Sequence, residues 1–291
     1  MALYGALELG GTKTLAAVGT SPDDMSAPLR IPTEDPESTL SRVIDYLGEH
    51  RVDAVGVSSF GPVELRQTHD SFGSITATPK PGWSNTDVLG TISRGLDVPA
   101  SIDTDVNGAA LAEGRWGSAQ HLNTFLYMTV GTGIGVGAVV DGHTLSGLGH
   151  PEMGHVVVVR EKDDDYSGRC SFHGDCLEGM ACGPALVDRF GSSDGWGGEV
   201  RDLVVAYLAQ GLRSIVYALA PERIVVGGGV SKLPCFHTKL QTSLTVQLAG
   251  YPPIPERESE AFISPPLLED SGLVGALILA EQATNQAGWN S

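Results

Sequence analysis

The sequence predicts an α/β protein, and three observations support this fold class. The chain contains 38 glycines, which is too many for a plain helical bundle. These glycines gather in short runs directly after apolar segments, the pattern of α/β chains whose turns handle phosphate groups. The hydrophobic content of 41% and the mean hydropathy of +0.02 are typical of a soluble globular protein. At 291 residues, the chain is long enough for about two domains and a substantial buried core.

The first predicted element is a β-hairpin. Residues 3–9 and 14–18 are apolar and too short for helices, and Gly10-Gly11-Thr12-Lys13 lies between them. Consecutive glycines permit positive φ and close approach of the backbone to an oxyanion, while Thr12 and Lys13 add a hydroxyl and a charge. A hairpin turn that binds nothing would use the same residues, so this motif alone leaves both interpretations open.

Helices and strands then alternate. Asp35 as N-cap and Pro36 at the first position predict a helix that ends near His50. Residues 54–59 form a buried strand that runs into the turn Phe60-Gly61-Pro62, which can present backbone groups to a ligand. Residues 76–83 form an extended, proline-stiffened segment with Lys80 and Trp83, for which a plain surface loop is the alternative. Residues 86–96 are predicted to be a helix.

Residues 100–113 predict a strand that passes directly into a helix. Asp105 and Asn107 would lie at the carboxyl end of the strand and the amino end of the helix. Ligands of open α/β sheets bind at that edge, so both residues are candidates for a functional site. The alternative is that Asp105 merely caps the helix, which is a common use of aspartate. Asp103 is expected to be structural.

A second copy of the hairpin follows about 120 residues after the first. Strands at 123–130 and 134–140 flank Gly131-Thr132-Gly133, so the chain is expected to form two related α/β lobes that face a shared nucleotide. Helices at 184–190 and 199–219 precede a strand at 223–226. Gly227-Gly228-Gly229-Val230-Ser231 is then expected to open another helix, whose N-terminus suits an anion or a nucleoside. Residues 269–283 form a closing helix.

A structural zinc site is predicted between residues 149 and 179. His155, Cys170, His173 and Cys176 form a His-x14-Cys-x2-His-x2-Cys array, and a tetrahedral Cys2His2 shell is one that zinc prefers. The metal would clamp this loop to a strand at residues 156–159. It would thereby also fix Glu152 and Glu178, and paired carboxylates suit the hydroxyls of a polyol. Incidental thiols beside ordinary histidines, and solvated glutamates, are the alternatives.

The charge balance limits the partners. A net charge of −17 argues against nucleic acids and anionic membranes. Phosphates would need backbone N–H groups, a well-placed lysine and Mg²⁺. Two cysteines outside the zinc array make no disulfide framework, and the N-terminus has no basic region before its apolar run, so a cytoplasmic location is expected. We expect no apolar stretch to approach the roughly 18 residues of a membrane span. The acidic residues 161–165 are expected to be solvated and mobile.

Together these motifs resemble the ROK family of sugar kinases, and within it the bacterial fructokinases. Glu8 to Lys13 resembles the first phosphate motif, in which most members carry Asp instead of Glu8. Gly131 to Gly133 resembles the second phosphate motif, and Gly227 to Ser231 the adenosine motif. Thr104-Asp105-Val106-Asn107 is similar to the catalytic segment Asn-Asp-Ala-Asn, and residues 78–83 resemble a fructokinase feature. Residues 268–271 depart from the family's Gly-Asp-Asn-Ala.

The resemblance implies two actin-like (ribonuclease H-like) lobes around an ATP cleft, one at 1–118 completed by 270–291 and one at 119–269 with the zinc-stapled loop. It implies ATP-dependent phosphorylation of D-fructose, with Asp105 as general base and Mg²⁺ and structural zinc as cofactors. The implied sugar-binding residues are Gly61, Asn107, Glu152, His155 and Glu178. The implied nucleotide-binding residues are Gly10, Gly11, Thr12, Lys13, Thr132, Gly133, Pro184, Gly227, Gly228, Gly229, Val230 and Ser231.

Other functions stay open at this point. A glucokinase, mannokinase or N-acetylmannosamine kinase of the same family would carry the same motifs. A sugar-sensing repressor of the family would need an N-terminal helix-turn-helix, and the first strand predicted at residue 3 leaves no room for one. A zinc-stapled interaction module would not explain three glycine motifs. Homodimer formation is left open.

Overall fold

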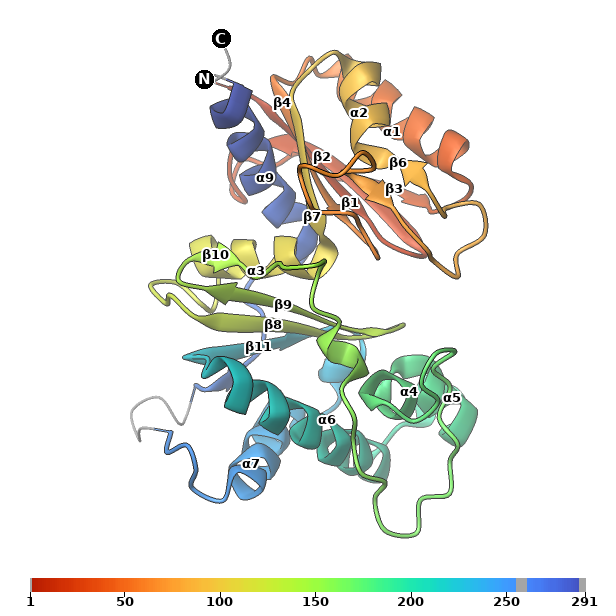
Figure 1. The fold of residues 1–291 in the computed structure, drawn as a ribbon, viewed down its shortest axis with the longest axis vertical. Coiled ribbons are helices and arrows are strands. Elements are labelled where there is room, and N and C mark those ends of the chain that lie inside the picture. Colours follow the sequence, from red (N-terminus) through yellow and green to blue (C-terminus); the bar gives the residue numbers. More distant parts are fainter. Residues whose placement is uncertain (1, 255–260, 288–291) are drawn as a thin grey trace. The chain divides into compact units, whose positions relative to one another are not determined.

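The computed structural model describes residues 2–254 and 261–287, which fold into two compact units (Figure 1). As far as the structure describes them, the first unit comprises Met1–Gly117, Thr144–Pro151 and Leu268–Ser291. The second comprises Ser118–His143 and Glu152–Leu267. The short segment 144–151 therefore packs with the first unit although it lies in the middle of the second in sequence.

The first unit contains a five-stranded sheet of order β3-β2-β1-β4-β7. β1 pairs antiparallel with β2, which confirms the first predicted hairpin, and β1, β4 and β7 run parallel. A separate two-stranded sheet joins β5 and β6. The strand bounds are Tyr4–Leu9 (β1), Lys13–Gly19 (β2), Leu29–Pro32 (β3), Ala54–Ser59 (β4), Ser74–Ile75 (β5), Thr86–Asp87 (β6) and Ala100–Thr104 (β7).

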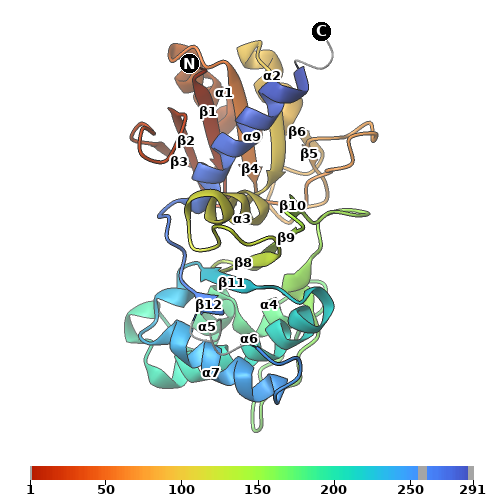
Figure 2. The ribbon, with the colours of Figure 1, turned by 90° about the vertical axis from the view of Figure 1, so that its left-hand side faces the viewer.

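Helices cover both faces of this sheet (Figure 2). Both faces are apolar, because large and small apolar side chains alternate along its strands. Large side chains such as Leu7 pack against α1 and α2, whereas small ones such as Ala6 face α9. Gly56 lets α9 approach closely, since a Cβ at this position would meet the backbone oxygen of Ala276 at 1.8 Å. As predicted, Asp35 caps α1 by accepting from the Ser38 N–H. The helix bounds are Pro36–Glu49 (α1), Val88–Leu96 (α2), Asp105–Trp116 (α3) and Ser271–Ala287 (α9).

The second unit repeats this plan with a sheet of order β10-β9-β8-β11-β12. β8 and β9 form the second predicted antiparallel hairpin, and β11 runs parallel to β8. The strand bounds are Phe125–Val130 (β8), Ile134–Val140 (β9), His143–Thr144 (β10), Arg223–Gly227 (β11) and Ile263–Ser264 (β12). The helix bounds are Leu177–Ala181 (α4), Gly183–Phe190 (α5), Gly198–Leu219 (α6) and Phe236–Leu248 (α7), with 3₁₀ turns at Met153–His155 (η1), Ser193–Gly195 (η2) and Val230–Lys232 (η3).

Helix α6 corrects the expectation that no apolar stretch approaches the length of a membrane span. Within the described residues it is the one helix long and apolar enough to cross a membrane, and 56% of its most apolar window is buried. It packs against α4 and α7 and contributes side chains such as Val204 and Leu208 to the core of the second unit. The packing explains its apolar composition as that of a core helix.

Two other expectations for this unit are wrong. Residues 156–159 form no strand, apart from one isolated bridge between Val157 and Cys176. Side chains of α6, and not a neighbouring strand, accept hydrogen bonds from backbone N–H groups here. Gln210 accepts from the Val159 N–H at 2.8 Å, and Tyr207 accepts from the nearby Glu161 N–H at 3.1 Å. The acidic run is also not wholly solvated, because Asp164 is buried against Arg189 and accepts from its guanidinium at 2.6 Å.

Candidate active site and metal centre

The parallel strands of the first unit bring three predicted functional segments to one edge of its sheet. Leu9 is in register with Ser59, which is in register with Thr104, so Gly10, Phe60 and Asp105 all follow at the same edge. The Phe60 N–H donates to the Leu9 carbonyl at 2.7 Å. This bond fixes the turn that contains Gly61 beside the start of the glycine hairpin.

Asp105 is the first residue of α3, and it is not the residue that caps this helix. The N-cap is Thr104, whose hydroxyl accepts from the Asn107 N–H at 3.2 Å. Thr104 thus performs the role that the sequence left open for Asp105. The Asp105 carboxylate is half-buried, and one of its oxygens accepts from the Val106 N–H at 2.9 Å. Asp105 thus lies at the carboxyl edge of the sheet, where ligands of open α/β sheets bind.

Asn107 and Asp103 form a buried polar pair behind this edge. Asn107 is fully buried, and its Nδ2 donates to Asp103 Oδ1 at 2.7 Å. Asp103 also accepts from the Thr104 N–H at 2.7 Å and from the Thr144 hydroxyl at 3.1 Å. Burial raises the pKa of Asp103, while these hydrogen bonds partly offset that effect. Asp103 therefore links β7, α3 and the segment 144–151, in agreement with the structural role expected for it.

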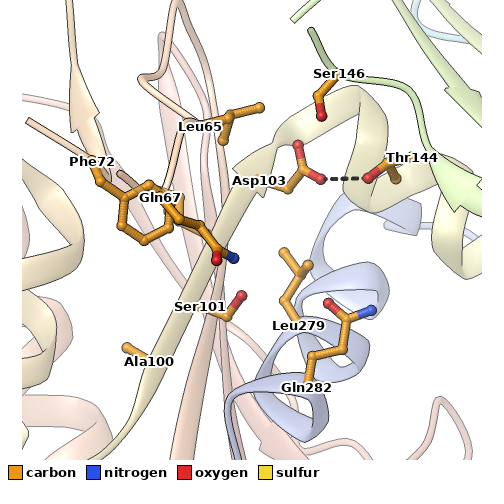
Figure 3. Close-up of a pocket in the computed structure, with 11 residues that line it drawn as sticks. Leu65, Gln67, Phe72, Ala100, Ser101, Asp103, Thr144, Ser146, Leu279 and Gln282 are labelled. Carbon is orange, nitrogen blue, oxygen red and sulfur yellow. Dashed lines mark hydrogen bonds between the residues drawn. The ribbon is translucent and has the colours of Figure 1, made fainter. Parts of the chain in front are cut away.

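A cavity of about 210 Å³ lies along the outer edge of β7 (Figure 3). Asp103 and Thr144 lie at one end of it and Ala100 at the other, with Phe72 on one side and Leu279 of α9 on the opposite side. Its lining contains no Lys, Arg or His side chain, so it offers no positive charge to a phosphate. The phosphate-binding candidates of this unit lie instead in the glycine hairpin.

The hairpin Gly10-Gly11-Thr12-Lys13 is held in shape from behind by Thr33. The Thr33 N–H donates to the Thr12 carbonyl at 2.9 Å, and its hydroxyl donates to the Gly10 carbonyl at 2.7 Å. Gly10 is required here, because a Cβ would lie 2.6 Å from the Lys13 carbonyl oxygen. Gly11, Thr12 and Lys13 are exposed, so their backbone and side chains are accessible to an anion.

Glu8 lies in β1, two residues before the hairpin turn, and its carboxyl group is a weaker acid than usual. Burial raises the pKa of Glu8 to about 7, with a further contribution from the negative charges of Asp105 and Asp270. Its Oε2 is buried and has no hydrogen-bond partner among the described residues. Gly272 makes room for the side chain, since a Cβ there would lie 3.0 Å from Glu8 Oε1. Ionised Glu8 is thus destabilising unless a positive charge is added beside it.

We expect Glu8→Gln to stabilise the protein at alkaline pH. Because the folded pKa is raised above 4.5, wild type is stabilised by protonated Glu8 at low pH and loses this stability as the pH rises to about 7. At pH 8 the variant should gain up to about 3 kcal/mol, or roughly 5 °C in Tm, and this advantage should vanish near pH 4.5. Thermal unfolding across this range tests it, with Glu49→Gln on the exposed end of α1 as control. An equal effect at both pH values would contradict the assignment.

In the second unit, two glycine motifs meet at one edge of the sheet. Thr129 is in register with Gly227, so the turns that follow β8 and β11 lie side by side. Gly228 has a φ of +90°, and a Cβ there would lie 2.4 Å from the Val130 carbonyl oxygen. The Gly183 N–H donates to the Gly131 carbonyl at 2.7 Å, which brings Pro184 at the start of α5 to the same edge.

The expectation that Gly227 to Ser231 opens an α-helix is wrong. Only the 3₁₀ turn η3 follows, and α7 begins at Phe236. Pro234 disfavours helical geometry at Leu233, and Cys235 has a φ of +57°. Any nucleotide contact at this motif therefore depends on the close backbone approach of its glycines and not on a long helix dipole.

His155, Cys170, His173 and Cys176 form one cluster, in which the four ligand atoms all lie within 4.8 Å of one another. His155 Nδ1 lies 3.4 Å from Cys176 Sγ and 3.6 Å from Cys170 Sγ, and His173 Nδ1 lies 3.7 Å from Cys170 Sγ. Ligands of a single tetrahedral zinc are separated by roughly 3.3–3.8 Å, given bond lengths of about 2.0–2.3 Å. The four cysteines of the chain form no disulfide, so the thiols of this cluster are available. The cluster is compatible with a zinc site.

Local backbone geometry explains how distant residues form this cluster. Cys170 and Gly174 exchange backbone hydrogen bonds of 3.1 and 2.9 Å, and Gly174 adopts a φ of +67° that closes the tight turn. Cys176 is the N-cap residue of α4, and His155 ends the turn η1. One turn, one helix start and one 3₁₀ turn thus each direct thiol or imidazole groups to the same point.

Two carboxylates adjoin the cluster. His155 Nε2, the ring nitrogen that faces away from the thiols, lies 3.9 Å from Glu178 Oε1. Glu178 Oε2 accepts from the Ile134 N–H at 2.9 Å, directly after the second glycine motif. Burial is the largest cause that raises the pKa of Glu152, and the charge of Glu178 adds to it whereas that of His155 opposes it. His155 can therefore bind a metal through Nδ1 and still present Nε2 to a polar ligand beside Glu178.

Comparison with known proteins gives the family. Residues 4–283 match the ROK family. The chain belongs to the ROK family. It is 37% identical to a fructokinase of Zymomonas mobilis over 98% of both chains, and 38% identical to a fructokinase of Lactococcus lactis over 92% of this chain and 93% of the other. A ROK family glucokinase from Streptomyces griseus, solved in complex with glucose and AMPPNP, shares the fold with a TM-score of 0.77 at 23% identity, covering 96% of this chain and 99% of that one.

Sequence reasoning missed two residues that shape the ROK site. Thr33 and Glu8 were not identified as candidates, although Glu8 begins the first motif. A lone threonine after Pro32 carries no local signal, because its partners lie about 20 residues earlier. Glu8 could have been identified by its position, since an acidic residue in an apolar strand is costly to bury.

Proposed function

We propose that this chain is a fructokinase, which transfers the γ-phosphoryl group of ATP to the 6-hydroxyl of D-fructose and releases ADP and fructose 6-phosphate. The observation that carries this function is the identity of 37–38% to fructokinases over nearly the full length. The motifs of both units add support, because each predicted phosphate motif lies at the carboxyl edge of its own sheet.

Asp105 is the proposed general base. Its carboxylate would accept the proton of the fructose 6-hydroxyl as that oxygen bonds to the γ-phosphorus, while the bond from the γ-phosphorus to the bridging oxygen of ADP breaks. Thr104 supports this role, since it caps α3 and leaves the carboxylate of Asp105 free of that task. The buried pair of Asn107 and Asp103 holds the start of α3 in place, so Asn107 contributes through position as well as through any contact with the sugar.

Each unit contains glycine motifs that are the proposed nucleotide contacts. Gly11, Thr12 and Lys13 are exposed, so their N–H groups and the Lys13 ammonium would contact phosphate oxygens. Gly10 would shape the turn, since its own N–H donates to the Lys13 carbonyl at 3.1 Å. In the second unit the proposed nucleotide contacts are Thr132, Gly133, Pro184 and the run from Gly227 to Ser231. Mg²⁺ bound to the nucleotide would neutralise developing phosphate charge, a large requirement in a chain of net charge −17.

The sugar hydroxyls would be bound by Gly61, Glu152, His155 and Glu178. Zinc held by His155, Cys170, His173 and Cys176 would be structural, because all four ligands come from protein. It would fix the imidazole of His155 through Nδ1, so that Nε2 and the neighbouring Glu178 keep one orientation. Carboxylates are suited to accept hydrogen bonds from a polyol, and the Nε2–H of an imidazole bound to zinc through Nδ1 is suited to donate one.

Steady-state turnover of a sugar panel, followed by coupled detection of ADP, tests the function. We expect kcat/KM for fructose to exceed those for glucose, mannose and N-acetylmannosamine by at least about tenfold, which corresponds to roughly 1.4 kcal/mol of discrimination. A higher value for one of the other sugars would replace fructose as the substrate and retain the kinase. Turnover of none of these sugars with ATP would contradict the proposed function.

A further inference from the structure

Lys80 is a half-buried cation without a carboxylate partner. Its Nζ donates to the Thr33 carbonyl at 2.8 Å, and in the part of the chain that the structure describes no Asp or Glu oxygen lies within 4.0 Å of it. The chain has only five lysines against 35 acidic residues. In a chain with such an excess of carboxylates, an ammonium that is held in place and has no carboxylate beside it is informative. The site of Lys80 therefore favours an anionic ligand.

Thr33 connects Lys80 directly to the glycine hairpin. The same residue that accepts from Lys80 donates its N–H to the Thr12 carbonyl and its hydroxyl to the Gly10 carbonyl. It also lies 2.8 Å, Oγ1 to Oγ1, from Thr14. Thr33 thus contacts both the Lys80 ammonium and the glycine turn. The exposed N–H groups of this turn are the phosphate-binding candidates of the unit.

Trp83 makes the position of Lys80 rigid. Its side chain is fully buried, its Nε1 donates to the Glu34 carbonyl at 2.7 Å, and its ring contacts that of Phe60 edge-on at 5.4 Å between centroids. The Trp83 N–H donates to the Lys80 carbonyl at 3.3 Å. The segment from Thr78 to Trp83 is accordingly an anchored loop and not the plain surface loop that the sequence left open, so little entropy is lost when Lys80 binds a ligand.

We propose that Lys80 is a second phosphate-binding cation, which acts with Lys13 on the phosphate chain of the nucleotide. One of the three ammonium donors is used by Thr33, so two remain for phosphate oxygens. Phosphate is favoured over a neutral sugar because an unpaired ammonium gains most from a charged acceptor. The inference rests on the proposed kinase function and adds a residue to its nucleotide site.

Direct binding of AMPPNP and of AMP to the full chain, measured by calorimetry, tests the role of Lys80. Lys80→Met keeps the length of the side chain and removes the charge. We expect about a 10- to 100-fold loss of AMPPNP affinity, the range for a hydrogen bond to a charged group, and little change for AMP, which lacks the β- and γ-phosphates. Lys80→Arg should restore most of the loss. Lys239→Met, on α7 of the other unit, is the control for removal of one positive charge.

Unchanged AMPPNP affinity in Lys80→Met would overturn the proposal, and so would equal losses for AMPPNP and AMP, since these would show that the substitution only distorts the hairpin. A merely structural Lys80 would change the thermal midpoint without this selectivity for the phosphate chain. Either result leaves the fructokinase function intact if wild type phosphorylates fructose with ATP. Failure of wild type to do so would contradict the proposed function itself.

Discussion

Asp105→Asn should lower kcat by about 10²- to 10⁴-fold and leave the fold unchanged. This range is the usual contribution of a general base, and Asn has nearly the same size as Asp but accepts no proton. The substitution leaves the helix cap in place, because that cap is the hydroxyl of Thr104. Fructose and AMPPNP should bind with affinities close to those of wild type. The measurement is kcat with saturating fructose and ATP, together with the dissociation constants of both ligands.

A matched control separates the loss of a base from the loss of a charge. Asp35→Asn also removes a carboxylate at a helix start of the same unit, and Asn caps a helix as well as Asp does. This variant should therefore keep the kcat of wild type. If Asp105→Asn turned over fructose at a near-normal rate, or if it lost activity only because the protein unfolded at a lower temperature, Asp105 would not be the base.

Local patterns in the sequence predicted most of the fold correctly. Both hairpins form where short apolar runs flank a glycine turn, and α1 begins at Pro36 after Asp35 as expected. The strand-to-helix passage at Asp105 was also predicted, because its signals lie within a dozen residues. Elements whose capping and periodicity agree with each other can thus be predicted from sequence alone.

The incorrect expectations concern segments whose partners are distant in sequence. Residues 156–159 are all valine, yet they form no strand. Side chains of α6 instead accept from backbone N–H groups of this part of the chain, Gln210 from Val159 and Tyr207 from Glu161. Asp164 lies in a run of charges, yet Arg189 and the Tyr207 hydroxyl bury it. The contacts of Thr33 have the same cause, since its four partners come from the glycine turn after β1, from β2 and from the loop that carries Lys80. A short stretch of sequence carries no information about such long-range contacts.

Removal of the zinc ligand Cys176 should impair fructose binding much more than ATP binding. Purified wild type should contain about one equivalent of zinc per chain, and Cys176→Ala should lose it because a tetrahedral site with three ligands is much weaker. Cys176 is the N-cap residue of α4, which carries Glu178 two residues later, and His155 lies beside both side chains. Loss of the metal should therefore release Glu178 and Glu152 together and raise the KM for fructose roughly 10²-fold.

The expected damage is local because the second unit has its own core. Residues of β8, β11 and α6 such as Leu126, Val225 and Leu208 are fully buried, and none of them is a ligand of the metal cluster. Zinc content by elemental analysis, KM for both substrates and the thermal midpoint together test this, and a strong chelator should reproduce the variant in wild type. Cys235→Ala, which removes an exposed thiol outside the cluster, should keep its zinc. If metal-free protein bound fructose as tightly as the zinc-loaded form, zinc would not position the sugar site, even if the four residues bind it.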